Sequence, residues 1–221
     1  MQFTLASAHQ DFFTQHQYIE FENVFSLEEM QTLQSAIQEA LVQREKKIIQ
    51  TRSPKELFKV GRDLWRDHPD IKKVVLHKRL AKIASPLFRQ PIIRIAYDQA
   101  LISPHPGEPI FSEPLPLQKV SCFQPIAGAV ILRLSYDLTP PPLLPQKIGS
   151  ALFIGPNFPI PWSSFLQNTP SFFFIIAYST ERTVYVLERQ DPHTHALKQL
   201  GYGFGDLLEE RTHPIVFNNK A

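Results

Sequence analysis

The chain has 221 residues, of which 43% are hydrophobic, and its formal net charge is +2. This length and apolar share are ample for one buried core, whereas the small charge gives no reason by itself to expect a nucleic acid or a membrane as partner. The one cysteine, Cys122, excludes an internal disulfide and a zinc site built from cysteines. Residues 1–13 lack the basic start of a signal peptide, and the longest apolar run, 172–178, is too short to cross a bilayer. We therefore expect a soluble, cytoplasmic protein.

The prolines divide the chain into two parts. Only Pro54 and Pro69 precede residue 85, and most of the 20 prolines lie between residues 86 and 192. Because proline interrupts helices and central strands, the chain changes character near residue 86. We expect a single domain over 1–221, in which 18–89 holds an N-terminal strand and helices and 90–221 holds a β-barrel core and a C-terminal tail.

The first part opens with a predicted strand over 18–24 and a helix that begins after Ser26. Ser26 and Glu29 have the spacing of a capping box, in which each side chain satisfies a backbone N–H of the other residue. Apolar residues at steps of three and four then form one stripe: Met30, Leu33, Ile37 and Leu41.

Two more helices are predicted before residue 90. Ser53 and Glu56 form a second capping box with Pro54 at the first helical position, and we expect that helix to continue to Leu64. A third helix is expected over 69–86, capped by residue 67 or 68.

From residue 91 onward the pattern is that of short strands separated by turns. The candidate strands are 92–102, 118–123, 129–138, 150–154, 171–178 and 183–189. A short helix is expected around 197–208 and a last extended piece over 214–218. Strands at this spacing favour a sandwich or a barrel over a parallel α/β sheet.

The run YIEFENVFSLEEMQTLQSAI over 18–37 resembles the opening of phytanoyl-CoA-dioxygenase-type proteins. The similarity continues through 68–89 and the strand 93–102, and the chain as a whole resembles a small group of uncharacterised chlamydial proteins. This resemblance implies an α+β fold, a double-stranded β-helix (jelly-roll) barrel with an N-terminal helical segment packed against it. It also implies non-haem Fe(II), 2-oxoglutarate-dependent oxygenase chemistry, and it places Arg182 where that family carries its 2-oxoglutarate-anchoring arginine.

The iron site of that family needs the triad H-x-D/E plus a distant histidine. The expected place for the first part, 108–123, contains no such string, and about ten residues before Arg182 stand Phe172, Phe173 and Phe174. The two H-x-D strings, at His9 and His68, lie outside the expected barrel. We therefore predict no catalytic residues and no cofactor, and instead a protein that binds a small molecule or a protein partner. Arg182 either contacts an anion in the barrel mouth or is a surface charge at a strand end.

Two alternatives remain open. His193 and His195, with His213 downstream, could hold Fe(II) in an active oxygenase that uses 2-oxoglutarate, although Asp191-Pro192 also predicts that these two histidines belong to a loop. The residues 62–89 hold eight Lys or Arg against three Asp, which fits either a metal-responsive or DNA-binding regulator or the solvated face of a helix. A small-molecule or protein partner remains the leading hypothesis over nucleic acid, and no membrane partner is expected.

Overall fold

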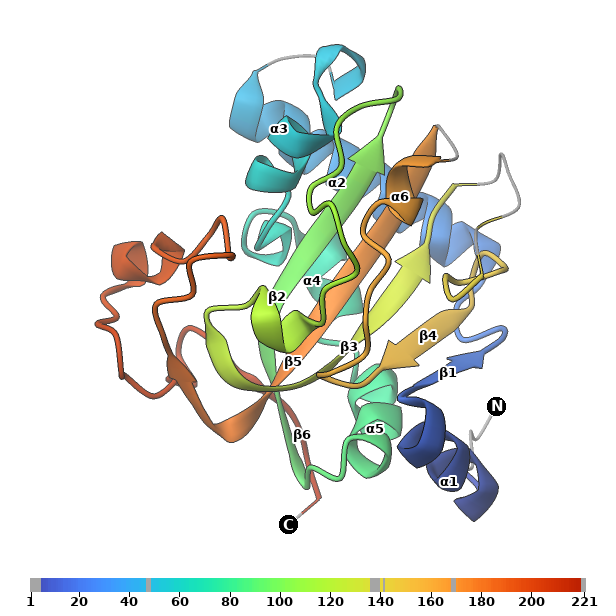
Figure 1. The fold of residues 1–221 in the computed structure, drawn as a ribbon, viewed down its shortest axis with the longest axis vertical. Helices are drawn as coiled ribbons and strands as arrows, with labels where there is room; N and C mark the ends of the chain where they lie inside the picture. Colours follow the sequence, from blue (N-terminus) through green and yellow to red (C-terminus); the bar gives the residue numbers. More distant parts are fainter. Residues whose placement is uncertain (1–4, 47–48, 136–139, 141, 168–169, 220–221) are drawn as a thin grey trace.

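One curled antiparallel sheet forms the centre of the molecule (Figure 1). The computed structural model describes residues 5–46, 49–135, 140, 142–167 and 170–219. The strand order is β1-β4-β3-β5-β2-β6. The strands are β1 Tyr18–Phe21, β2 Ile92–Ser103, β3 Phe123–Arg133, β4 Ala151–Ile154, β5 Ser171–Tyr185 and β6 Ile215–Asn218.

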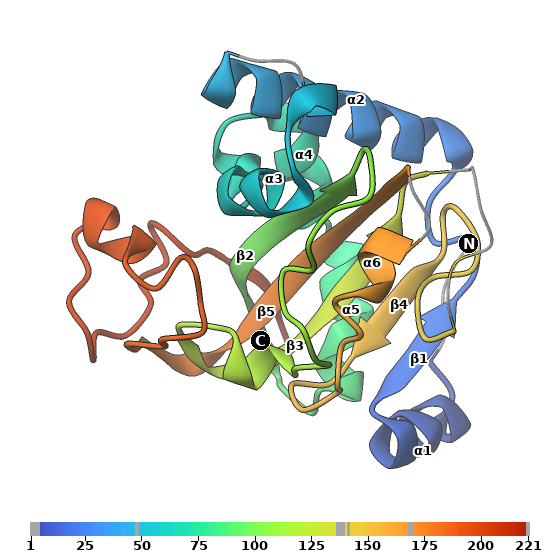
Figure 2. The same cartoon turned by 45° about the horizontal axis from the view of Figure 1, so that its top comes forward.

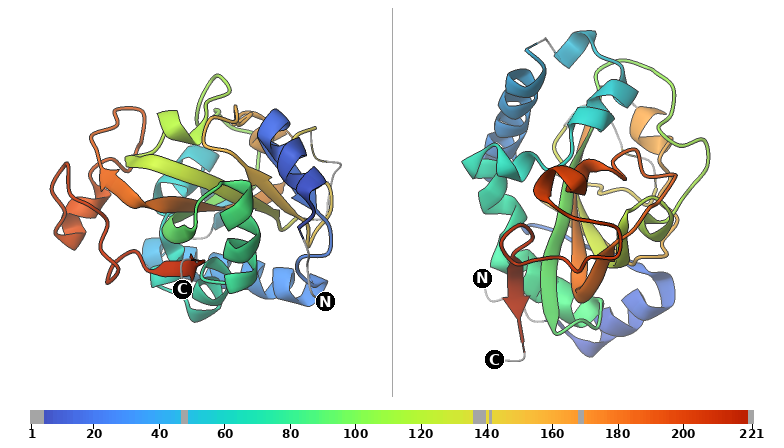
Figure 3. Two further views of the ribbon diagram at one scale, coloured as in Figure 1. Left: turned by 90° about the horizontal axis from the view of Figure 1, so that it is seen from below. Right: turned by 90° about the vertical axis from the view of Figure 1, so that its left-hand side faces the viewer.

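Helices from the first ninety residues cover one face of this sheet (Figures 2 and 3). The α-helices are α1 Ser7–His16, α2 Leu27–Glu45, α3 Pro54–Val60, α4 Pro69–Val75, α5 Lys78–Leu87 and α6 Ser164–Gln167. Short 3-10 helices are η1 Ile49–Thr51, η2 Leu64–Arg66, η3 Leu117–Lys119 and η4 Ala196–Leu200. None of the helices in the described ranges is long and apolar enough to span a bilayer.

The two predicted capping boxes are present. The Ser26 hydroxyl accepts from Glu29 N at 3.1 Å and Ser26 N donates to the Glu29 carboxylate at 2.7 Å, and Ser53 and Glu56 make the same exchange. The helix after Ser53 ends at Val60 instead of reaching Leu64, which belongs to η2.

The single helix predicted over 69–86 is wrong, since the chain forms α4 and α5 there. His68 caps the first through Nδ1, which accepts from Asp70 N at 3.2 Å. His77 leaves the helical conformation and caps the second by accepting from Arg79 N at 3.1 Å. The His77 side chain thus satisfies a backbone N–H group that has no partner within the first turn of α5.

Three predictions in the second part of the chain need correction. The predicted strands 171–178 and 183–189 are one continuous strand, β5, which pairs with β2 on one side and β3 on the other. The strand predicted over 118–123 is instead η3, and β3 begins at Phe123. The helix predicted over 197–208 is only η4, which ends where Gly201 adopts a left-handed φ of 90°.

The long central strands β2 and β3 are largely buried. All twelve residues of β2 are buried, and even the charged Arg133 of β3 is buried. Its guanidinium donates to the Ser135 and Gln146 carbonyls. Residues 136–138 of the strand predicted over 129–138 lie outside the described residues.

Two apolar clusters lie on the two faces of the sheet. One joins α2, α4 and α5 to the sheet. The other covers the opposite face with side chains from loops, η3 and α6, where Leu115 and Ile160 form an isolated bridge. The expected helices on an antiparallel sheet are therefore confirmed. In the residues that the structure describes, the predicted jelly-roll barrel is present in part, as one curled six-stranded sheet whose open face is covered by loops.

Gly128 of β3 tests this packing. A Cβ atom at this position would lie 2.6 Å from the Ile154 carbonyl oxygen and 2.7 Å from the Phe88 ring. We expect Gly128→Ala to lower the free energy of unfolding by about 2 kcal/mol, because both neighbours are held in the core. Urea denaturation followed by circular dichroism measures the change. Gly203→Ala is the control, since its Cβ would make only a 3.4 Å contact with Asp206. Equal stability of the two variants would contradict the close packing at Gly128.

Candidate functional site

A buried ion pair lies at the edge of the loop-covered face. Arg62, between α3 and η2, and Asp191, in the loop after β5, are 129 positions apart in the sequence. The Arg62 Nη1 atom donates to both Asp191 carboxylate oxygens, at 2.9 and 3.0 Å. The two side chains are 6% and 0% exposed, so water does not screen this pair.

The neighbours of the pair complete its hydrogen bonds. The Arg62 guanidinium lies 4.1 Å from the centroid of the Tyr97 ring, and its Nε donates to Gln99 at 3.2 Å. The Asp191 carboxylate also accepts from Cys122 N at 2.8 Å and from His193 N at 2.9 Å. Each charge is therefore neutralised by protein groups, as a buried ion pair requires.

The pKa shifts within this cluster indicate a structural role. Burial alone would raise the pKa of Asp191, but Arg62 and the N–H groups of His193 and Cys122 hold it below its usual value. Burial raises the pKa of the Cys122 thiol and of the Tyr97 hydroxyl. Burial and the positive charge of Arg62 lower the pKa of His193. At neutral pH the thiol is protonated and the imidazole uncharged, so neither is an activated nucleophile or a cationic acid.

A second polar cluster surrounds His213, which is completely buried. Its Nε2 lies 3.3 Å from Arg66 Nη2 and its Nδ1 lies 3.2 Å from the Tyr202 hydroxyl. Arg94 donates to the His213 carbonyl oxygen. Burial, with the positive charges of Arg66 and Arg94, lowers the pKa of His213 to about 3. The imidazole is thus neutral over the physiological range.

The structure does not bring the three candidate histidines together. His193 packs beside the Phe58 ring, His195 is exposed and faces Phe204, and His213 belongs to the Arg66 cluster. Across the described part of the chain, no three His, Cys, Asp or Glu side chains are placed so that they could hold a metal ion. His193 lies in a loop, and His195 is the residue directly before η4. The Asp191-Pro192 turn predicts this loop placement.

The other residues considered as site candidates from the sequence each have their own local contacts. Arg182 is exposed near the end of β5, and its backbone N–H donates to the Thr180 hydroxyl at 3.1 Å. His9 lies inside α1, a helix that the sequence did not predict, and its Nδ1 accepts from Ala6 N. His68 caps α4 and lies 3.5 Å from the exposed Glu39.

The two segments in which the resemblance led us to look for iron ligands contribute apolar side chains to the loop-covered face. Phe173 is 3% exposed and packs against Phe165, with ring centroids 5.1 Å apart. Within 108–123, the residues Leu117, Val120 and Cys122 are buried in the same cluster. Phenyl and aliphatic groups have no lone pair for Fe(II), and the Cys122 thiol stays protonated, so these residues do not fit an iron centre.

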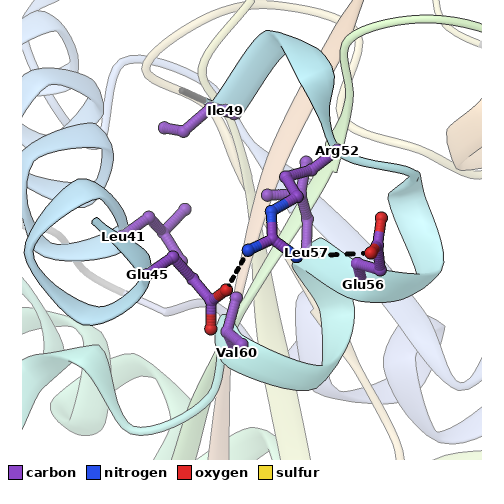
Figure 4. Close-up of a pocket in the computed structure, with 7 residues that line it drawn as sticks. All are labelled: Leu41, Glu45, Ile49, Arg52, Glu56, Leu57 and Val60. Carbon is purple, nitrogen blue, oxygen red and sulfur yellow. Dashed lines mark hydrogen bonds and ion pairs between the residues drawn. The ribbon is translucent and has the colours of Figure 1, made fainter. Parts of the chain in front are cut away.

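The small hollow between α2 and α3 is not a ligand site. Its volume is about 10 Å³, room for one water at most. Figure 4 shows Arg52 between the carboxylates of Glu45 and Glu56, with which it forms ion pairs. Through these two ion pairs Arg52 connects α2 to α3.

Comparison with known proteins shows the fold. No protein-family model and no curated protein matches the chain. The non-heme alpha ketoglutarate dependent carbocyclase SnoK from nogalamycin biosynthesis matches with a TM-score of 0.69 at 15% identity, over 96% of each chain. The epimerase SnoN, solved with Fe3+, alpha ketoglutarate and nogalamycin RO, matches with a TM-score of 0.65 at 12% identity, over 96% of this chain and all of SnoN. CT296 from Chlamydia trachomatis matches with a TM-score of 0.53 at 17% identity, over 81% of this chain and 99% of CT296. The predicted resemblance to iron oxygenases and to chlamydial proteins is confirmed as a likeness of fold.

Removal of one partner from the buried ion pair has a predictable cost. Arg62→Met leaves the Asp191 charge buried without its cation, so we expect a loss of about 3–5 kcal/mol in the free energy of unfolding. Arg62→Met/Asp191→Asn removes both charges and keeps a carbonyl acceptor, so it should be more stable than Arg62→Met alone. Denaturation at pH 7 measures the free energy of unfolding of both variants. The control, Lys147→Ala, breaks an exposed 2.8 Å pair with Glu22 and should cost about 0–1 kcal/mol. An Arg62→Met variant as stable as this control would contradict a structural role for the pair.

His213 makes stability depend on pH. Its pKa is about 3 when folded and about 6.5 when unfolded, so between these values only the unfolded chain binds the proton. The free energy of unfolding therefore falls as the pH drops from 6.5 toward 3, by about 1.4 kcal/mol per pH unit from this residue.

His213→Gln should reduce that slope by about one proton equivalent, leaving the contribution of His193, whose pKa is also lowered. Thermal and urea unfolding between pH 4 and 7 measure the slope. His105→Gln, which changes an exposed loop residue, should preserve the wild-type profile. An unchanged slope in His213→Gln would show that the buried imidazole is not the titrating group.

Proposed function

We propose that the chain is a non-catalytic binding protein built on a reduced double-stranded β-helix, in which loops replace the second sheet. It recognises a small molecule or a protein at its surface. In this proposal residues 1–221 act as one domain. The buried free thiol of Cys122 agrees with the reducing, cytoplasmic compartment that we propose for it.

The observation that supports this function best is the composition of the loop-covered face. Iron and 2-oxoglutarate in a non-haem oxygenase need a cavity lined by nitrogen and oxygen ligands with open coordination positions. Here the corresponding segments contribute phenylalanine and aliphatic side chains to a packed cluster. The buried Arg62 and Asp191 side chains at the edge of this face bind each other.

Arg182 has a surface role in this proposal. Its side chain is exposed, which suits contact with an anionic group of a partner better than the anchoring of 2-oxoglutarate in a closed cavity. The active-oxygenase alternative would need His193, His195 and His213 at one metal ion, and their different neighbours give it no support.

An anaerobic titration of the purified full chain with Fe(II) and 2-oxoglutarate tests this function. We expect no stoichiometric iron uptake, no metal-to-ligand absorption band and no release of succinate in air. An active 2-oxoglutarate oxygenase in the same assay is the positive control. Uptake of one equivalent of Fe(II) with turnover of 2-oxoglutarate would overturn the proposal, and retention of that activity in a His193→Ala/His213→Ala variant would exclude those two ligands as well.

A further inference from the structure

A wide groove lies between α5 and β6, outside the loop-covered face. Figure 1 shows these two elements side by side near the C-terminal end of the described chain. The groove has a volume of about 760 Å³, within the range of roughly 300–1,000 Å³ that is typical of small-molecule sites. We call it the α5–β6 groove. It is lined by Leu5, Lys78, Arg79, Lys82, Ile83, Ser85, Pro86, Arg89, Gln90, Pro91, Phe217 and Asn219.

The charged side chains of the α5–β6 groove are all basic. Lys78, Arg79, Lys82 and Arg89 are exposed at its rim, and among the described residues that line it there is no Asp or Glu. Two of the four are held in position by hydrogen bonds, from Arg79 to the Val24 carbonyl and from Arg89 to the Thr14 hydroxyl. These bonds leave the positive charges unneutralised.

Lys78 and Lys82 are the two lysines of the groove. Neither Lys78 nor Lys82 forms an ion pair with any residue that the structure describes. They are four positions apart on one helix, and side chains at this spacing lie on the same face. Two flexible ammonium groups above one groove form a site for an anionic group with several oxygen atoms.

The basic run 62–89 thus has two different parts. Arg62 is buried against Asp191, and Arg66 lies over the Trp65 ring and beside His213. Only the later part of the run, on and after α5, faces the groove. Four of the eight basic residues of this run therefore line one hollow, whereas Lys72 and Lys73 lie exposed on α4.

The rest of the lining is largely apolar. Leu5, Pro86 and Phe217 are half-buried, and Ile83 is part of the main core. An apolar surface below a basic rim favours a ligand with one anionic end and one apolar end. A nucleic-acid backbone would use the rim but leave this apolar surface without a partner.

We infer that the α5–β6 groove binds an anionic amphiphile, a phosphate or carboxylate joined to an apolar chain, with Lys78 and Lys82 at the anion. The soluble monomer and the headgroup of an acidic lipid share this chemistry. The inference does not depend on the absence of iron chemistry, because no residue of the groove belongs to the Arg62 or His213 clusters.

Calorimetric titration of the full chain with monomeric octyl phosphate tests the site. We expect saturable binding, at least about tenfold tighter than inorganic phosphate, because the alkyl chain buries apolar surface. Lys78→Ala/Lys82→Ala should weaken binding by about tenfold or more, the equivalent of losing charge-assisted hydrogen bonds. The matched control, Lys59→Ala/Lys73→Ala, removes the same charge from exposed lysines outside the groove and should bind as the wild type does.

Flotation with phosphatidylglycerol vesicles distinguishes a membrane lipid from a free ligand. Binding to octyl phosphate and to vesicles, both lost in Lys78→Ala/Lys82→Ala, supports the groove and identifies a membrane lipid. Binding to the monomer alone supports the groove and identifies a free ligand. Three results would overturn the inference. They are the absence of saturable octyl phosphate binding, an equal loss of binding in the two double-lysine variants, and binding to vesicles or to a DNA duplex without binding to octyl phosphate.

Discussion

The Arg62–Asp191 ion pair is the constraint on which the loop-covered half of the molecule depends. It joins the segment after α3 to the loop after β5, while Asp191 also fixes the backbone at Cys122, just before β3. Tyr97 and Gln99 bring β2 into the same cluster. A carboxylate with this many donors has one stable position, so segments distant in the sequence are held in one arrangement.

That arrangement explains how loops can serve as the second layer of the fold. A sheet face needs an apolar cover, and loops supply one only if their backbone polar groups find partners. Here Trp162 donates through its indole N–H to the Leu115 carbonyl, and its ring packs on Phe111 and Phe165. The aromatic side chains fill the space, and the few backbone bonds hold the loops that carry them.

The sequence predicted what depends on local patterns. Ser26 and Ser53 mark helix starts because capping uses residues three positions apart, and β2 was predicted from the isoleucine-rich segment after Pro91. It missed α1, whose N-cap residue is an alanine and which buries only Phe13. It also missed the Arg62–Asp191 pair, since nothing in either neighbourhood indicates a partner 129 residues away. At the candidate site the local signal was Asp191-Pro192, which predicted the loop that carries the carboxylate.

The likeness to SnoK and SnoN is compatible with a different function because fold and chemistry depend on different residues. The shared architecture follows from strand pairing and from two apolar clusters, which tolerate many substitutions. An iron centre depends on only three side chains, so this architecture does not require them. In the function proposed above, a ligand is recognised at the outer surface. The helices supply such a surface at α5, where basic residues that are not needed for packing surround an apolar groove.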